Sequence, residues 1–183
     1  MIPDLLADAR KKMETAVDHV GAEFTTVRTG RANPQILHRV QVEYYGTPTN
    51  LQQLASFSVP EPRLLVVQPY DRSSMAAIER AIKASDLGLN PSNDGNVIRL
   101  SFPPLTEERR RELIKMVKHM AEEGRVAVRN VRRHAKEDME ALHGEVSDDE
   151  IRRGEKDLQE LTDRHVQKID DLLSHKETEL LEV

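Results

Sequence analysis

The residues of this sequence best suited to chemistry are arginines and lysines that recur within residues 105–136. Their spacing places seven of them on one stripe of a helix: Arg111, Lys115, Lys118, Arg125, Arg129, Arg132 and Lys136. Arg109, Arg110 and Arg133 add charge beside this stripe. A guanidinium group binds phosphate through two parallel hydrogen bonds, so the stripe predicts a contact with an anionic partner.

The charge distribution supports this interpretation. Residues 105–136 contain 10 Lys and Arg against 5 Asp and Glu, whereas residues 137–183 contain 6 against 16. From Arg125 to Lys136 there is no Asp or Glu, so we expect no neutralisation within that stretch. Acidic residues of a neighbouring helix remain an alternative source of neutralisation, and the stripe is then an ordinary solvated face.

The kind of anion is restricted by composition. The net charge of −5 argues against indiscriminate nucleic-acid binding. Aromatic residues make up 3% of the chain, which argues against base stacking on single strands. Recognition of a folded nucleic acid through its backbone and shape fits better.

Enzymatic chemistry finds little support. The chain has no Cys, its seven His residues are scattered, and no nucleotide-binding glycine motif, nucleophile elbow or zinc motif occurs. We therefore expect no enzyme, metal or cofactor. The chain also lacks a signal-peptide core and a membrane-spanning run, which predicts a cytoplasmic protein.

Three segments are predicted to form long amphipathic helices. The first covers residues 2–27, the second runs for roughly 38 residues from Thr106, its expected N-cap, and the third starts with a capping box at Ser147 and Glu150. Gly124 lies inside the second helix, where we expect a close helix crossing rather than a hinge. His165 is expected on the inward face of the third helix. Matching apolar stripes predict a three-helix bundle.

The middle of the chain is predicted to be a small α/β unit. Alternating apolar residues indicate strands at 40–44 and 56–59, a short apolar run indicates a strand at 64–68, and a last strand is expected at 97–102. A helix is expected over residues 73–85, with Ser73 as its possible cap. Residues 46–48, 90–91 and 93–96 are predicted turns, and Pro60-Glu61-Pro62 is expected to break the chain.

These elements predict an α+β protein with a discontinuous bundle. Residues 1–30 and 105–183 form the bundle, and residues 31–104 form the inserted domain. The connections carry Gly30 and Pro34 on one side and Pro103 and Pro104 on the other, where we predict a hinge.

Five blocks of sequence carry a family resemblance. They are Val27-Arg28-Thr29-Gly30-Arg31-Ala32-Asn33-Pro34, Val42-Glu43-Tyr44-Tyr45-Gly46-Thr47-Pro48, Ala84-Ser85-Asp86-Leu87-Gly88-Leu89-Asn90-Pro91, Pro103-Pro104-Leu105-Thr106-Glu107-Glu108-Arg109-Arg110 and Arg125-Val126-Ala127-Val128-Arg129-Asn130-Val131-Arg132-Arg133. In content and order they closely resemble the motifs of bacterial ribosome recycling factors.

The resemblance implies an L-shaped monomer in which the elongated three-helix bundle carries a small β/α/β sandwich domain. It implies binding to the post-termination ribosome, mainly to RNA of the large subunit, and subunit separation with elongation factor G and GTP. It implies no small-molecule substrate and no membrane partner. By position, Arg110, Arg129 and Arg132 match residues that the family uses towards ribosomal RNA, and Arg133, Arg28 and Arg31 are weaker candidates.

Two other functions compete with this one. A helical adaptor would bind an acidic protein with the same basic stripe, and its binding would depend weakly on salt. An unfamiliar hydrolase or metalloenzyme is the second, which an activity screen with a chelator control would detect.

Overall fold

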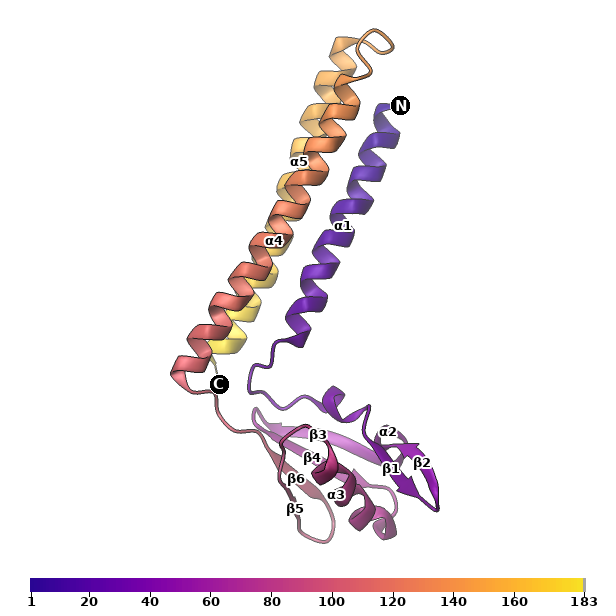
Figure 1. The fold of residues 1–183 in the computed structure, drawn as a ribbon, viewed down its shortest axis with the longest axis vertical. Coiled ribbons are helices and arrows are strands. Elements are labelled where there is room, and N and C mark those ends of the chain that lie inside the picture. Colours follow the sequence, from indigo (N-terminus) through magenta and orange to yellow (C-terminus); the bar gives the residue numbers. More distant parts are fainter. Residues whose placement is uncertain (183) are drawn as a thin grey trace. The chain divides into compact units, whose positions relative to one another are not determined.

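The computed structural model describes residues 1–182 of the chain. It divides into two compact units: residues 1–28 with 107–182, and residues 29–106. The first unit holds three long helices, and the second holds two small antiparallel sheets (Figure 1). The predicted α+β class is confirmed.

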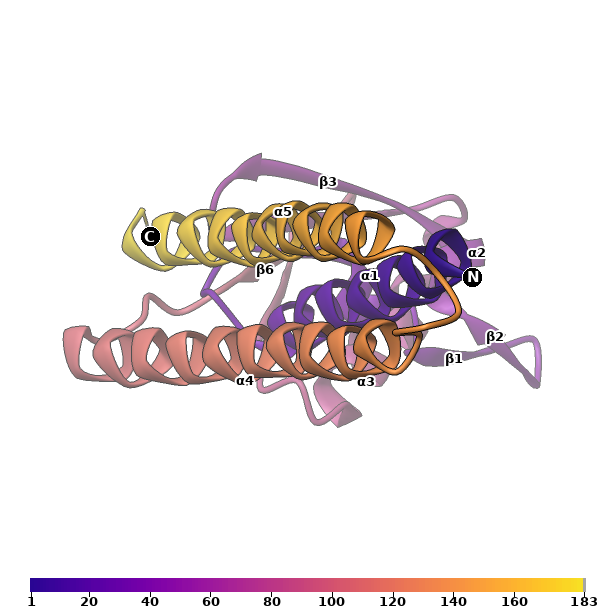
Figure 2. The same cartoon turned by 90° about the horizontal axis from the view of Figure 1, so that it is seen from above.

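The bundle consists of α1 (Ile2–Thr26), α4 (Glu107–Glu140) and α5 (Asp148–Leu181). Figure 2 shows α1 lying along both α4 and α5, and each helix contacts the other two. The α4 helix has 34 residues, fewer than expected, because its end is closed by tight turns at Leu142 and His143. Gly144, at φ 91°, then reverses the chain direction towards α5.

The buried stripes follow the predicted periodicity with small shifts. Leu113 is buried at 4% exposure, whereas the neighbouring Ile114, whose spacing also fits the apolar stripe, is half-buried. In α1, Val17 is buried and the neighbouring Ala16, whose spacing also fits the apolar stripe, is half-buried. A helix that meets two neighbours needs a wider apolar face than one stripe provides, which explains why adjacent positions share the burial.

Gly124 allows the predicted close crossing of helices. A Cβ atom placed on it would lie 2.3 Å from Cγ2 of Val20 and 3.3 Å from Cδ1 of Ile169. These neighbours belong to α1 and α5, so all three helices meet at this glycine. A second close approach, at Gly154, was not predicted: its Cβ would lie 2.6 Å from Cγ2 of Ile2.

The start of α5 carries the predicted capping box. The Glu150 amide donates to the Ser147 hydroxyl at 3.3 Å, and the Ser147 amide donates to the Glu150 carboxylate at 3.1 Å. Further along α5, His165 is buried at 3% exposure, as predicted. Its Nδ1 atom lies 2.7 Å from the carbonyl oxygen of Leu161, while its buried Nε2 atom has no hydrogen-bond partner.

The second unit contains a hairpin and a four-stranded sheet. The hairpin pairs β1 (Gln41–Tyr44) with β2 (Thr47–Asn50). The sheet has the antiparallel order β3-β4-β6-β5, from β3 (Ala55–Glu61), β4 (Leu64–Pro69), β5 (Pro91–Asn93) and β6 (Ile98–Ser101). Four short helical segments complete the unit: η1 (Pro34–Leu37), α2 (Leu51–Leu54), η2 (Arg72–Ser74) and α3 (Met75–Ala84).

The core of this unit lies between the strands and α3. Val42 of β1, Leu65 of β4, Ile78 of α3 and Ile98 of β6 are fully buried in one apolar cluster. The α3 helix contacts both β1 and β5. Because β1 contributes to this cluster, the hairpin is held to the rest of the unit by its inward side chains.

Three turn predictions in this unit were wrong in detail. The hairpin turn is Tyr45-Gly46, both with positive φ, so Thr47 and Pro48 belong to β2 rather than to the turn. Pro60 does not end β3, but it lies where the register with β4 shifts, between Ser58 and Glu61. The strand continues because β3 is an edge strand, where a missing amide costs no ladder bond. Pro91 begins β5 instead of forming a turn.

The expected cap at Ser73 was also wrong. Asp71 caps η2 instead, because its carboxylate accepts from the Ser73 amide at 2.9 Å. The predicted turn at residues 93–96 is present, and Asp94 organises it by accepting from the amides of Asn96 and Val97, both at 2.9 Å. These bonds, with a further one from Arg99, lower the pKa of Asp94 to about 2.

Candidate nucleic-acid interface

The basic stripe lies on the flank of α4 that is next to α5. Three of its cations pair with carboxylates of α5: Lys118 with Glu177 at 3.4 Å, Arg125 with Asp170 at 2.7 Å, and Lys136 with Glu155 at 3.8 Å. Part of the stripe is therefore neutralised by the third helix, the alternative that the sequence left open.

Arg125 is the clearest case of a structural cation. Its side chain is 19% exposed, and both Nε and Nη2 lie within 2.8 Å of Oδ1 of Asp170. Its Nη1 also pairs with Glu122 at 3.0 Å. A guanidinium held on two sides by carboxylates has little capacity left for a phosphate, so Arg125 joins α4 to α5.

Glu122 corrects one prediction about the stripe. Because there is no Asp or Glu from Arg125 to Lys136, the sequence predicted no neutralisation within that stretch. In the structure Glu122 pairs with Arg125 and, two turns away, with Arg129 at 3.2 Å. Hydrogen bonds from Arg125 and then Arg129 lower the pKa of the Glu122 carboxyl. Both pairs could have been predicted from the sequence, because Glu122 lies three residues before Arg125 and seven before Arg129, on the same side of the helix.

Arg129 nevertheless remains accessible. Its side chain is 56% exposed and that of Glu122 is 53% exposed. Exposed ion pairs contribute roughly 0–1 kcal/mol, so a phosphate group can replace this carboxylate at small cost.

Arg132 and Arg133 carry the least neutralised charge of the stretch from Arg125 to Lys136, whose other Arg and Lys residues all pair with carboxylates. Among residues 1–182, neither lies within ion-pair distance of a carboxylate oxygen. Arg133 is exposed, whereas Arg132 is half-buried and its Nε atom is buried without a hydrogen-bond partner. Burial of the inner part of the Arg132 side chain restricts its motion and so pre-orders its terminal amino groups.

The remaining candidates lie elsewhere. Arg110 is half-buried in the first turn of α4, 19 residues before Arg129, or about 28 Å along a helix at about 1.5 Å per residue. Arg28 is exposed just after α1, and Arg31 is exposed in the other unit. The structure therefore gathers Arg129, Arg132 and Arg133 on two successive turns and does not bring all six arginines together.

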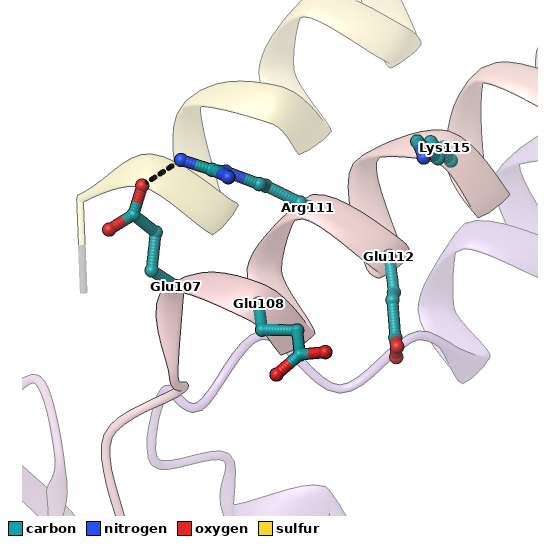
Figure 3. A pocket seen from close by; sticks show the side chains of 5 residues that line it. All are labelled: Glu107, Glu108, Arg111, Glu112 and Lys115. Carbon is teal, nitrogen blue, oxygen red and sulfur yellow. Dashed lines mark hydrogen bonds and ion pairs between the residues drawn. The ribbon is translucent and has the colours of Figure 1, made fainter.

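The first turns of α4 also border an open recess of about 530 Å³ (Figure 3). It is lined by charged side chains only: Glu107, Glu108, Arg111, Glu112 and Lys115. Arg111 points towards Glu107 and pairs with it. This recess offers no apolar wall to a small molecule. Across the described residues no cluster of three potential metal ligands occurs, and no described helix is long and apolar enough to cross a membrane.

Known proteins match this chain along its whole length. The family model described as "Ribosome recycling factor" matches residues 20–181. The ribosome-recycling factor of Acidothermus cellulolyticus is 57% identical, with 100% of both chains covered, and that of Kocuria rhizophila is 56% identical, with 99% of both covered.

Solved structures of ribosome recycling factors also match this chain. A solution structure of the ribosome recycling factor matches with a TM-score of 0.75 and 44% identity, covering 100% of this chain and 98% of the other. A model of the T. thermophilus ribosome recycling factor, described with E. coli elongation factor G on the E. coli post-termination complex, matches with a TM-score of 0.64 and 45% identity over 99% of both chains.

These matches place the chain among the non-enzymatic translation factors. It belongs to the ribosome recycling factor family.

Proposed function

We propose that this protein acts on the post-termination ribosome with elongation factor G and GTP, separating the subunits and releasing the mRNA for a new round of translation. The observation that carries this proposal is the full-length family match, which includes both units of the fold. A similar chain has been described together with elongation factor G on a post-termination complex. The compartment we propose is the cytoplasm, where bacterial ribosomes work.

The direct test follows light scattering of purified post-termination ribosomes. A fall in scattering that requires this protein, elongation factor G and GTP together is the expected result. A control recycling factor establishes that the ribosomes and the elongation factor are competent. If the control splits ribosomes and this protein does not, the proposed function is wrong.

The RNA contact is proposed to centre on Arg129, Arg132 and Arg133. Arg129 and Arg133 are exposed and Arg132 is half-buried. All three combine weak or missing neutralisation with a common position on α4, and each can bind one or two phosphate oxygens. Arg110, Arg28 and Arg31 are proposed as additional contacts. Large-subunit RNA is the partner that the family resemblance implies. Because no aromatic side chain accompanies these arginines in the sequence, recognition should rest on the backbone and shape of the RNA.

Arg132→Ala tests this contact. Loss of one phosphate contact should weaken ribosome binding and reduce the slope of log affinity against log salt by roughly one. Arg153→Ala is the matched control, since Arg153 is 78% exposed on α5 and pairs with Asp149. An unchanged slope for Arg132→Ala would remove Arg132 from the interface. Binding that hardly depends on salt would instead favour the protein adaptor.

We also propose that the smaller unit swings about its two connections, driven by elongation factor G. Gly30 has φ 76°, a conformation that favours glycine. The amides of Ala32 and Phe102 bond the carbonyls of Pro62 and Arg63, each at 2.8 Å, so both connections are fixed to one turn of the smaller unit.

These bonds narrow the proposed hinge. Pro34 begins η1 on the folded side of the Ala32 bond. The rotation should therefore concentrate around Gly30 on one connection and around Pro103 and Pro104 on the other. Pro34 would then mark the boundary of the hinge, and the backbone beyond it would move with the smaller unit as one body.

Two glycines inserted beside Gly30 and two beside Pro104 test the swing. Looser connections should transmit force poorly, so splitting should slow while ribosome binding is kept. Two glycines inserted after Gly144, in the α4–α5 connection, are the control. Splitting at the normal rate with loosened connections would refute the mechanical coupling.

A further inference from the structure

The tip of the β1–β2 hairpin carries an exposed aromatic pair. Tyr45 is 81% exposed, and its ring lies edge-to-face with that of Tyr44, with centroids 4.5 Å apart. The hairpin forms an outer edge of the smaller unit (Figure 1). Two of the chain's three tyrosines thus sit together where the fold gains nothing from burying the Tyr45 ring.

The turn itself does not favour a tyrosine at this position. Tyr45 has φ 49° and is the only non-glycine residue with positive φ among residues 1–182. Asn or Gly fits such a hairpin turn with less strain, whereas a bulky side chain there is an outlier. Strain of this kind points to a role for the side chain beyond the turn.

One carboxylate contacts the pair, and a second precedes it in the sequence. The Tyr44 hydroxyl donates to Oδ2 of Asp71 at 3.2 Å, which fixes its ring. Glu43 precedes the pair and is exposed. The Ser73 amide donates to the Asp71 carboxylate and lowers its pKa, which favours the charged form of Asp71.

Positive charge is absent from the hairpin. Residues 41–50 contain no Lys or Arg. Arg39 lies at the opposite end of the hairpin, and the Arg72 side chain is occupied by Asn96, to which its Nη2 atom donates at 2.7 Å. An aromatic face beside carboxylates repels phosphate and attracts a cation, so the local charge disfavours RNA here.

We propose that Tyr44 and Tyr45, with Glu43 and Asp71, form a surface that holds an arginine or lysine side chain from a basic segment of a partner protein. The cation lies over the open face of the Tyr45 ring, and the two carboxylates supply the counter-charge. This surface is distinct from the arginines of α4, and its contact is with protein instead of RNA.

The test uses NMR titration of the full-length protein, followed at the Gly46 amide. The probes are a synthetic pentapeptide of alternating glycine and arginine, the same peptide with citrulline for arginine, and oligouridylate. The arginine peptide should shift this resonance saturably, and the uncharged citrulline peptide should not. Equal shifts from both peptides, or shifts from oligouridylate alone, would overturn the proposal.

Variants separate binding from folding. Tyr45→Asn suits the turn, so its thermal midpoint should be unchanged or raised, while its affinity for the arginine peptide falls about two- to fivefold. Val59→Ala is the control, because Val59 is exposed on β3 of the same unit and should leave the affinity unchanged. A stable Tyr45→Asn variant with undiminished affinity would show that the ring takes no part.

Discussion

The crossing of three helices at Gly124 makes a sharp prediction about stability. Gly124→Ala places a methyl group 2.3 Å from Cγ2 of Val20, although ordinary contact begins at 3.4 Å, so the atoms must separate by 3.4 − 2.3 = 1.1 Å. Val20 is β-branched and stiff, and it cannot turn away cheaply. Gly21→Ala is the matched control, because its added methyl group would meet nothing within 4 Å.

The magnitudes follow from two opposing effects. Replacing glycine by alanine inside a helix stabilises it by about 1 kcal/mol, and both variants gain this. Overpacking a core costs about 1–3 kcal/mol, and only Gly124→Ala suffers it. Gly21→Ala should therefore raise the free energy of unfolding by about 1 kcal/mol, and Gly124→Ala should fall below it by about 1–3 kcal/mol.

Urea unfolding followed by helical circular dichroism measures both variants. Val20→Ala combined with Gly124→Ala should recover part of the loss, because contacting residues are energetically coupled. If Gly124→Ala stabilises the protein as much as Gly21→Ala does, the helices are not in close contact at Gly124 and the packing described for the bundle is wrong.

Three further predictions concern other parts of the molecule. Ser147→Ala should cost about 1 kcal/mol, because the α5 capping box is lost, and an unchanged urea midpoint would contradict this. Asp94→Asn should flatten the acid dependence of the smaller unit's stability. The pKa of Asp94 is about 2 in the folded chain against an ordinary 3.8, so its contribution to stability is fully present above pH 3.8 and disappears towards pH 2. Proton NMR of the smaller unit across this pH range measures its unfolding, and the same acid dependence in Asp94→Asn as in the unchanged protein would contradict the prediction. Arg125→Ala should destabilise the bundle by leaving Asp170 unpaired, yet keep the salt slope of ribosome binding, and a reduced slope would make Arg125 an RNA contact.

The basic stripe illustrates what sequence spacing left undecided. Spacing placed Arg125, Arg129 and Arg132 on one flank of a helix, since a helix turns by a fixed angle per residue. Their separate roles depend on α5, which lies far along the chain: Asp170 takes up Arg125, while Arg132 has no carboxylate within ion-pair distance among the described residues. No local pattern specifies which carboxylate of one helix meets which cation of another.

The sequence by itself determined the elements whose causes are local. The capping box at Ser147 and the periods of the three long helices depend on neighbours within a few residues. The motif blocks also determined the family, because they recur in order along the chain. Tertiary structure decided the rest: that Gly154 approaches Ile2, that Pro60 is tolerated on an edge strand, and that Tyr45 occupies a strained turn with its ring in solvent. The first two features arise from contacts between distant segments, and their free energy is fixed only when those segments meet. The Tyr45 ring is exposed because the fold brings no other part of residues 1–182 over it.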